Sequence, residues 1–131
     1  MSTTTAAIPK ARTFAGSAEE IRSVRQFVGQ CIAGCPVADD VILLASEIAT
    51  NALRHTASGR DGTFIVLVRA AEGCTRVEVH DLGSDTEPAI GRSDSPGESG
   101  AGLAIVETVA ARWGFHGSRF GRVVWFEMDW R

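Results

Sequence analysis

Residues 46–56 read SEIATNALRHT and combine apolar and polar residues at helical spacing. Glu47, Asn51 and His55 are four residues apart, so they share one side of a helix. This side adjoins the apolar positions, which predicts polar groups at the rim of the core, where a cleft would lie. A carboxylate and an amide there could hold a hydrated Mg²⁺, although a solvated helix edge would show the same pattern.

The helix that carries this stretch is predicted to run from about residue 37 to residue 56. Its apolar stripe consists of Val41, Leu44, Ala45, Ile48 and Ala52. A second amphipathic pattern precedes it and predicts a helix over about residues 18–33. Ser17 and Glu20 have the spacing of a capping box at the start of that earlier helix.

Five strands and a third helix complete the expected fold. Alternating apolar and polar residues predict strands at 11–15, 63–70, 75–81, 114–118 and 122–130. The third helix is expected at about residues 103–112. Helices then cover one face of a mixed, mostly antiparallel sheet, which is a two-layer sandwich of the α+β class.

The strand at 75–81 ends in a carboxylate that is predicted to point inward. If Val77 and Val79 face the core, the alternation places Asp81 on the same side. A buried carboxylate is costly unless something donates a hydrogen bond to it, and the amino group of a ligand is one such donor. Gly83 would allow a sharp turn or the close approach of a flat ligand. The alternative is an aspartate that caps the turn at the end of the strand.

Residues 97–103, GESGAGL, end a long polar loop and open the third helix. Free backbone N–H groups and the helix dipole make such a junction a natural phosphate site. It is not a P-loop, because no Gly-Lys-Ser/Thr follows, and no strand leads into it as in a dinucleotide fingerprint. The loop over residues 84–100 is long for a compact domain, and such loops are often functional lids.

Composition excludes several classes of function. The net charge of −3 gives no basic footprint for direct nucleic-acid binding. No apolar run approaches the ~20 residues of a membrane span, and the first ten residues lack the apolar stretch of a signal peptide, so we expect a cytoplasmic protein. The odd number of cysteines, three, favours core thiols over disulfides. We expect one domain over residues 10–131, after a disordered tail over residues 1–9.

Taken in order, the three polar segments resemble the motif series of the GHKL, or Bergerat-fold, ATPases. The stretch SEIATNALRHT resembles the N box of that superfamily, HDLG its first glycine box and SGAGLAIVE its second. The ending GRVVWFEM is similar to the closing strand of small actinobacterial members, the anti-sigma-factor kinases. The resemblance extends over about residues 10–130.

This resemblance implies a site for ATP and Mg²⁺. Asn51 would coordinate the Mg²⁺ that bridges the phosphates, and Asp81 would accept a hydrogen bond from the adenine amino group. Arg54 and His55 would face the phosphates. In the anti-sigma-factor kinases, a glutamate at the position of Glu47 acts as general base on the substrate Ser or Thr hydroxyl.

The glycine boxes imply the rest of the nucleotide site. Gly83 would line the adenine pocket, while Gly100 and Gly102 would bring backbone amides to the phosphates. Leu103 continues this ATP-binding segment, and residues 84–100 would form the ATP lid.

Two classes of function are consistent with this resemblance. The first is an ATP-binding serine/threonine kinase that phosphorylates an anti-sigma-factor antagonist and so regulates transcription by partner switching. Its partners would be a sigma factor, the antagonist or both, and it could form a homodimer. The alternative is a non-catalytic regulator that sequesters a sigma factor or another partner, with or without nucleotide. A histidine-kinase role is disfavoured, because His55 lies inside the N box and a separate phosphoacceptor helix pair has no room.

Overall fold

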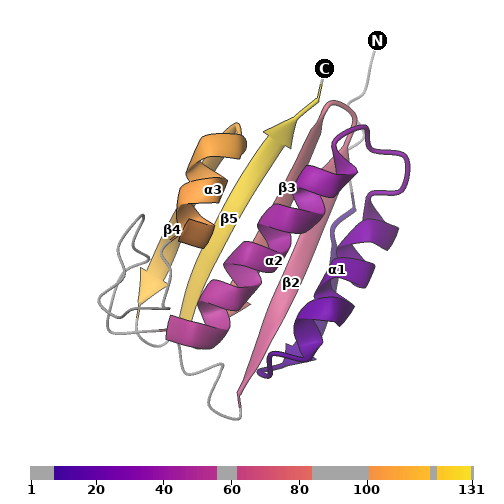
Figure 1. Ribbon diagram of the computed structural model, residues 1–131. Coiled ribbons are helices and arrows are strands. Elements are labelled where there is room, and N and C mark those ends of the chain that lie inside the picture. Colours follow the sequence, from indigo (N-terminus) through magenta and orange to yellow (C-terminus); the bar gives the residue numbers. More distant parts are fainter. Residues whose placement is uncertain (1–7, 56–61, 84–100, 119–120, 131) are drawn as a thin grey trace.

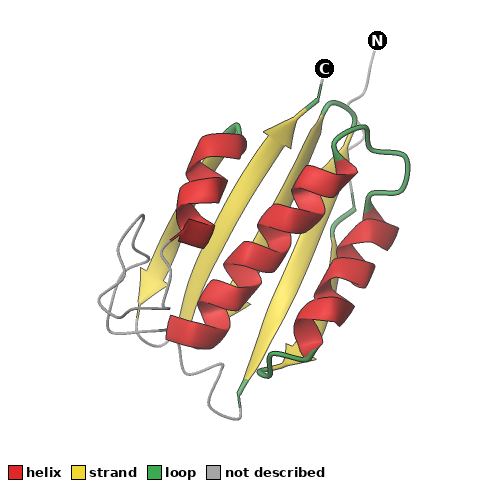
Figure 2. Cartoon of the chain, in the orientation of Figure 1, coloured by secondary structure: helices red, strands yellow, loops and turns green. Residues whose placement is uncertain are grey.

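The computed structural model describes residues 8–55, 62–83, 101–118 and 121–130. Within these ranges, three helices lie side by side on one face of a five-stranded sheet, and no described segment covers the other face (Figures 1 and 2). The elements in chain order are β1 (Lys10–Ala15), α1 (Glu20–Cys31), α2 (Ala38–His55), β2 (Thr63–Ala71), β3 (Cys74–Asp81), α3 (Ala101–Val109), β4 (Arg112–Ser118) and β5 (Gly121–Asp129). This is the predicted two-layer α+β sandwich.

The strands lie in the order β1-β2-β3-β5-β4. All four pairings among these described strands are antiparallel, so the sheet contains no parallel pair of the kind that a mixed sheet would have. The last strand, β5, lies between β3 and β4. Its first residues therefore lie beside the end of β3, where Arg122 is directly opposite Asp81.

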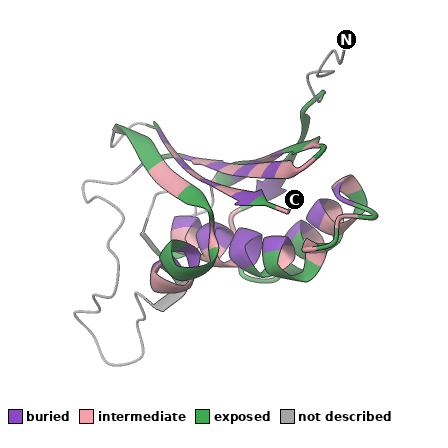
Figure 3. Ribbon diagram, turned by 90° about the horizontal axis from the view of Figure 1, so that it is seen from above, coloured by how far each residue is buried: buried purple, intermediate pink, exposed green. Residues whose placement is uncertain are grey.

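The core lies between the helices and the covered face of the sheet, where buried residues concentrate (Figure 3). The predicted stripe of α2 is buried at every position. The alternation in β3 is confirmed, because Val77 and Val79 are fully buried. In β5 Val124, Phe126 and Met128 are buried on the same side, as the alternation predicts. Burial of these side chains fixes which residues at the strand ends point inward.

Some predicted element ends are wrong. The capping box is absent, because α1 begins at Glu20 without a side-chain cap, and the Glu20 N–H instead donates to the main-chain oxygen of Ser17 at 3.1 Å. The third helix is shifted: it begins at Ala101 and ends at Val109, and Arg112 opens a strand. A tertiary contact explains this end, because the Arg112 side chain reaches carboxylates on β5.

The predicted tail and lid fall largely on residues 1–7 and 84–100, which lie outside the described ranges. No helix in the described ranges is long and apolar enough to cross a membrane. The three cysteines are free thiols and are partly buried.

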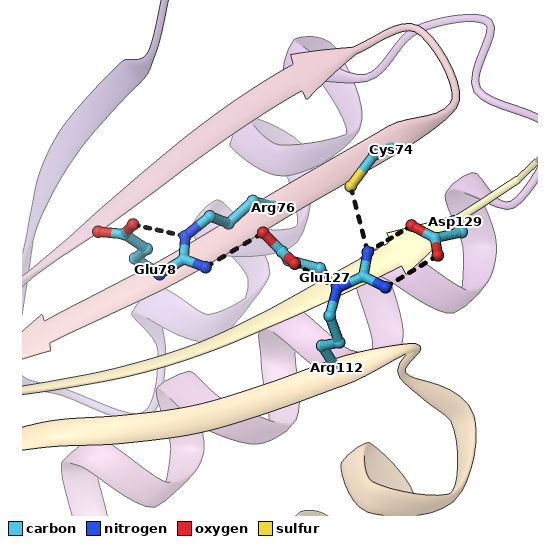
Figure 4. Close-up of polar contacts among 6 residues, drawn as sticks. All are labelled: Cys74, Arg76, Glu78, Arg112, Glu127 and Asp129. Carbon is cyan, nitrogen blue, oxygen red and sulfur yellow. Dashed lines mark hydrogen bonds and ion pairs between the residues drawn. The ribbon is translucent and has the colours of Figure 1, made fainter.

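A network of ion pairs lies on the uncovered face of the sheet (Figure 4). Arg112 on β4 contacts Glu127 at 2.6 Å and Asp129 at 2.6 Å, both on β5. Arg76 on β3 reaches Glu127 from the other side at 3.2 Å and also contacts Glu78. The hydrogen bond from Arg112, together with that from Arg76, lowers the pKa of Glu127 below its ordinary value.

Replacing Glu127 with glutamine is expected to lower the free energy of unfolding by about 1 kcal/mol at pH 7. Because the folded-state pKa of Glu127 is lowered, its contribution exists above the ordinary pKa of 4.5 and is lost as the pH falls through the folded-state value. Urea denaturation at neutral and acidic pH measures this difference. Glu107→Gln, at an exposed position of α3, is the control and should change little. If the loss in free energy of unfolding caused by Glu127→Gln is the same at neutral and acidic pH, the ionised carboxylate does not have this role.

Candidate functional site

Asp81 is the buried polar centre of one end of the sheet. Its side chain has 0% of its surface exposed. One carboxylate oxygen accepts the Gly83 N–H at 2.7 Å, and the other accepts Nε–H of Arg122 at 3.0 Å. Gly83 has a φ of 90°, which a glycine adopts without strain. The inward orientation of Asp81 is thus confirmed, and Asp81 also caps the turn after β3.

Arg122 belongs to this site, although none of the three sequence motifs contains it. Its Nη2 donates to Oδ1 of Asn51 at 3.0 Å, so one guanidinium bridges Asp81 and Asn51. Its third nitrogen, Nη1, is buried and has no hydrogen-bond partner within the described ranges. The strand alternation contained a signal for this residue, because Arg122 precedes the inward-facing Val124 and Phe126 by two and four positions.

The neighbouring strands fix the backbone of Arg122. It lies opposite Asp81 in β3 and opposite Gly117 in β4. Gly117 has a φ of 122°, and a Cβ added there would lie 2.7 Å from the Cα of Arg122. A side chain at this position would therefore displace the strand, and glycine permits the close approach of β4 to β5.

Glu47 and Asn51 lie one turn apart on α2, and both are half-buried. Between them Ile48 and Ala49 are fully buried, which anchors this part of the helix. Arg54 lies near the end of α2 and is exposed. His55 is the last residue of α2, and the structure does not describe its side chain. The structure thus joins Asn51 to Asp81 through Arg122 and places Glu47 on the adjoining turn.

The glycine-rich segment opens the third helix as predicted, although the helix starts earlier than residue 103: α3 begins directly after Gly100, and Gly102 is its second residue. Gly100 itself lies outside the described ranges. Leu103 is buried in the core with 2% of its surface exposed, so its side chain serves packing. The first turn of α3 and the last turn of α2 lie at the same end of the sheet as the end of β3 (Figure 1).

Burial has the largest effect on the pKa of Asp81. It raises the pKa of Asp81 above its ordinary value, and the charge of Arg122 and the Gly83 N–H only partly offset this effect. A buried carboxylate of this kind depends on donors, whether they come from the protein or from a ligand.

The residue types fit a magnesium–nucleotide site, but a cation of the protein already contacts them. No group of three or more His, Cys, Asp or Glu side chains forms a metal site within the described ranges. Mg²⁺ does not need such a group, because it commonly binds through one or two protein oxygens, several waters and substrate phosphates. The oxygen of Asn51 that would serve as ligand is the one that accepts the hydrogen bond from Arg122.

Comparisons with known proteins agree with this fold. The chain matches the family described as "Histidine kinase-like ATPase domain" over residues 14–128. A crystal structure of the RsbU and RsbW domains of Rv1364c from Mycobacterium tuberculosis is similar, with a TM-score of 0.70 and 19% sequence identity. The match covers 93% of this chain and 32% of that chain, so this chain spans about a third of the similar one.

No curated protein matches the sequence significantly. The family match nevertheless extends over nearly all of the sheet and all three helices. The chain belongs to the family of histidine kinase-like ATPase domains, the GHKL superfamily that its motifs resemble.

Proposed function

We propose that this chain is an ATP-binding serine/threonine protein kinase of the anti-sigma-factor type. The observation that carries the proposal is that Asn51 on α2 is connected to the buried carboxylate of Asp81 through Arg122, with Glu47 one helical turn before Asn51. Under this proposal, Glu47 would be the proton acceptor, Asn51 the amide ligand and Asp81 the acceptor for adenine. The family assignment supports nucleotide binding at this place.

The nucleotide would be held from three elements. Asp81 would accept a hydrogen bond from the adenine amino group, and Gly83 would line the base. Gly100, Gly102 and the main chain at Leu103 would donate to the phosphates at the start of α3, where the helix dipole favours negative charge.

Asn51 would hold Mg²⁺, which when bound neutralises charge on the phosphates. Arg54 and His55 follow at the end of α2 and would face the same phosphates. Both carry or can carry positive charge, so they would add to the same electrostatic stabilisation.

Glu47 would act as the general base. A hydroxyl that attacks a phosphoryl group must lose its proton, and a positioned carboxylate accepts it. Glu47 is suited to this role because Ile48 and Ala49, which follow it, are fully buried and hold the helix in place. A base on a rigid element keeps its position relative to the substrate.

The proposed substrate is a serine or threonine of an anti-sigma-factor antagonist, and the second proposed partner is a sigma factor. The similar solved chain contains an RsbW domain and an RsbU domain, which supports a regulatory setting with protein partners. We further propose that the protein acts in the cytoplasm, regulates transcription by partner switching and forms a homodimer.

Phosphate transfer from labelled ATP to candidate antagonist proteins tests this proposal. Glu47→Gln is expected to reduce the transfer rate roughly 10²–10⁴-fold, because only the proton acceptor is lost. The affinity for ATP–Mg²⁺, measured by calorimetry, should remain that of the wild type. The matched control is Asp40→Asn, the same kind of change at an exposed position of the same helix. If the wild type binds ATP but labels no antagonist, the kinase assignment is wrong.

The alternative is a non-catalytic regulator that binds a sigma factor or another partner. One observation favours it: Arg122 already engages both Asp81 and Asn51. Partner binding that is unchanged in Glu47→Gln, together with absent phosphate transfer in the wild type, would support this alternative.

A further inference from the structure

We propose that Arg122 is a latch on the nucleotide site, and that its guanidinium must leave Asp81 and Asn51 before ATP and Mg²⁺ can bind there. The inference rests on the proposed function, because it takes these two residues as the nucleotide ligands. According to this inference, the contacts of Arg122 determine how tightly the protein binds the nucleotide.

The contacts of Arg122 are made by one rigid group. Nε–H donates to Asp81 at 3.0 Å, and Nη2–H donates to Asn51 at 3.0 Å. Both nitrogens belong to the same planar guanidinium, so a rotation that breaks one contact disturbs the other. The two ligand residues are therefore released together.

The latch competes directly with the proposed ligands. Mg²⁺ would bind Oδ1 of Asn51 less favourably while a guanidinium donates to the same oxygen, since this would bring two cations close together. Oδ2 of Asp81 likewise accepts a hydrogen bond from Arg122, and Oδ1 accepts one from the Gly83 N–H, so an adenine amino group would compete with donors that the protein already supplies. Each contact of Arg122 thus has a counterpart in the bound nucleotide.

In the closed arrangement, one buried donor lacks a partner in the part of the chain that the structure describes. This donor is Nη1 of Arg122. A buried donor without an acceptor carries its desolvation cost uncompensated, so the closed state is stabilised less than a fully paired arginine would make it. The latch is therefore one that a ligand can open.

An apparent affinity falls in proportion to the fraction of protein that is competent to bind. In calorimetric titrations with ATP and Mg²⁺, Arg122→Met is therefore expected to bind at least about tenfold more tightly than the wild type. Arg76→Met is the matched control, because Arg76 lies on β3 but pairs with Glu78 and Glu127 on the uncovered face. Its affinity should equal that of the wild type.

The outcomes separate the latch from the proposed function. If Arg122→Met binds equally or more weakly while wild-type binding still requires Asn51, the latch is wrong and the ATP site stands. If neither the wild type nor Arg122→Met binds ATP, the proposed function fails, and the latch fails with it.

A second measurement uses the wild-type protein and does not depend on the stability of Arg122→Met. The Nε–H resonance of Arg122, assigned by its loss in Arg122→Lys, should exchange slowly with solvent in the free protein. It should shift when ATP and Mg²⁺ saturate the site, because Nε then loses Asp81 as its acceptor. An Nε–H resonance that keeps its position at saturation would overturn the latch.

Discussion

Replacing Arg122 with methionine is expected to lower the free energy of unfolding by about 3 kcal/mol at pH 7. The side chains of Arg122 and Asp81 are 4% and 0% exposed, so the change leaves a carboxylate buried without its cation. Methionine keeps much of the volume of the arginine stem, so the loss is electrostatic rather than a cavity. Urea denaturation followed by circular dichroism measures the difference.

The pH dependence of this deficit follows from the pKa of Asp81. Burial already raises that pKa above its ordinary value of 3.8, and removal of Arg122 raises it further. A carboxyl with a raised folded-state pKa stabilises the fold in its protonated form, and this contribution is lost as the pH rises through the folded-state pKa. The deficit of Arg122→Met should therefore be largest at neutral pH and shrink as the pH falls toward 3.8.

A double-mutant cycle gives the control. Asp81→Asn in the Arg122→Met background removes the unpaired charge, so it should raise the stability of that variant. In the wild-type background the same change should not be stabilising to this extent, because Arg122 would then lack its carboxylate. A deficit that is independent of pH and is not repaired by Asp81→Asn would show that the ion pair does not hold this end of the sheet.

Much of the fold could be predicted because the hydrophobic pattern determines it. The apolar stripe of α2 is buried as expected, and so are the apolar residues of β3 and β5 that the alternation places on the inner face. The same alternation placed Asp81 inward correctly. These features depend on local periodicity, which the sequence shows directly.

The alternation in β5 indicates that Arg122 faces inward, but it does not indicate which residues Arg122 contacts. The bridge through Arg122 requires β5 to lie between β3 and β4, and this non-sequential strand order sets Arg122 opposite Asp81. A charged residue at the start of a strand is usually exposed to solvent, so the residue type alone predicts an exposed side chain for Arg122 rather than a buried one. The wrong end of the third helix has a similar cause, because Arg112 is held in β4 by carboxylates of β5.

Removing the amide of Asn51 is expected to weaken the binding of ATP and Mg²⁺ at least about 100-fold, or about 2.7 kcal/mol. Asn51→Ala deletes the proposed Mg²⁺ ligand, and the remaining affinity should no longer depend on the metal. Titration with and without a chelator measures both effects. The cost in folding stability should be about 1 kcal/mol, because only the acceptor of Nη2 of Arg122 is lost.

The matched control for Asn51→Ala is Thr50→Ala, at the preceding residue of the same helix. The hydroxyl of Thr50 donates to the main-chain oxygen of Ser46 at 2.7 Å, so its loss concerns the helix alone. Thr50→Ala should therefore bind ATP and Mg²⁺ like the wild type. If Asn51→Ala instead retains wild-type affinity and metal dependence, Asn51 is not the metal ligand. The bridge between Asn51 and Arg122 would then be a structural contact, and the nucleotide site would lie elsewhere on the domain.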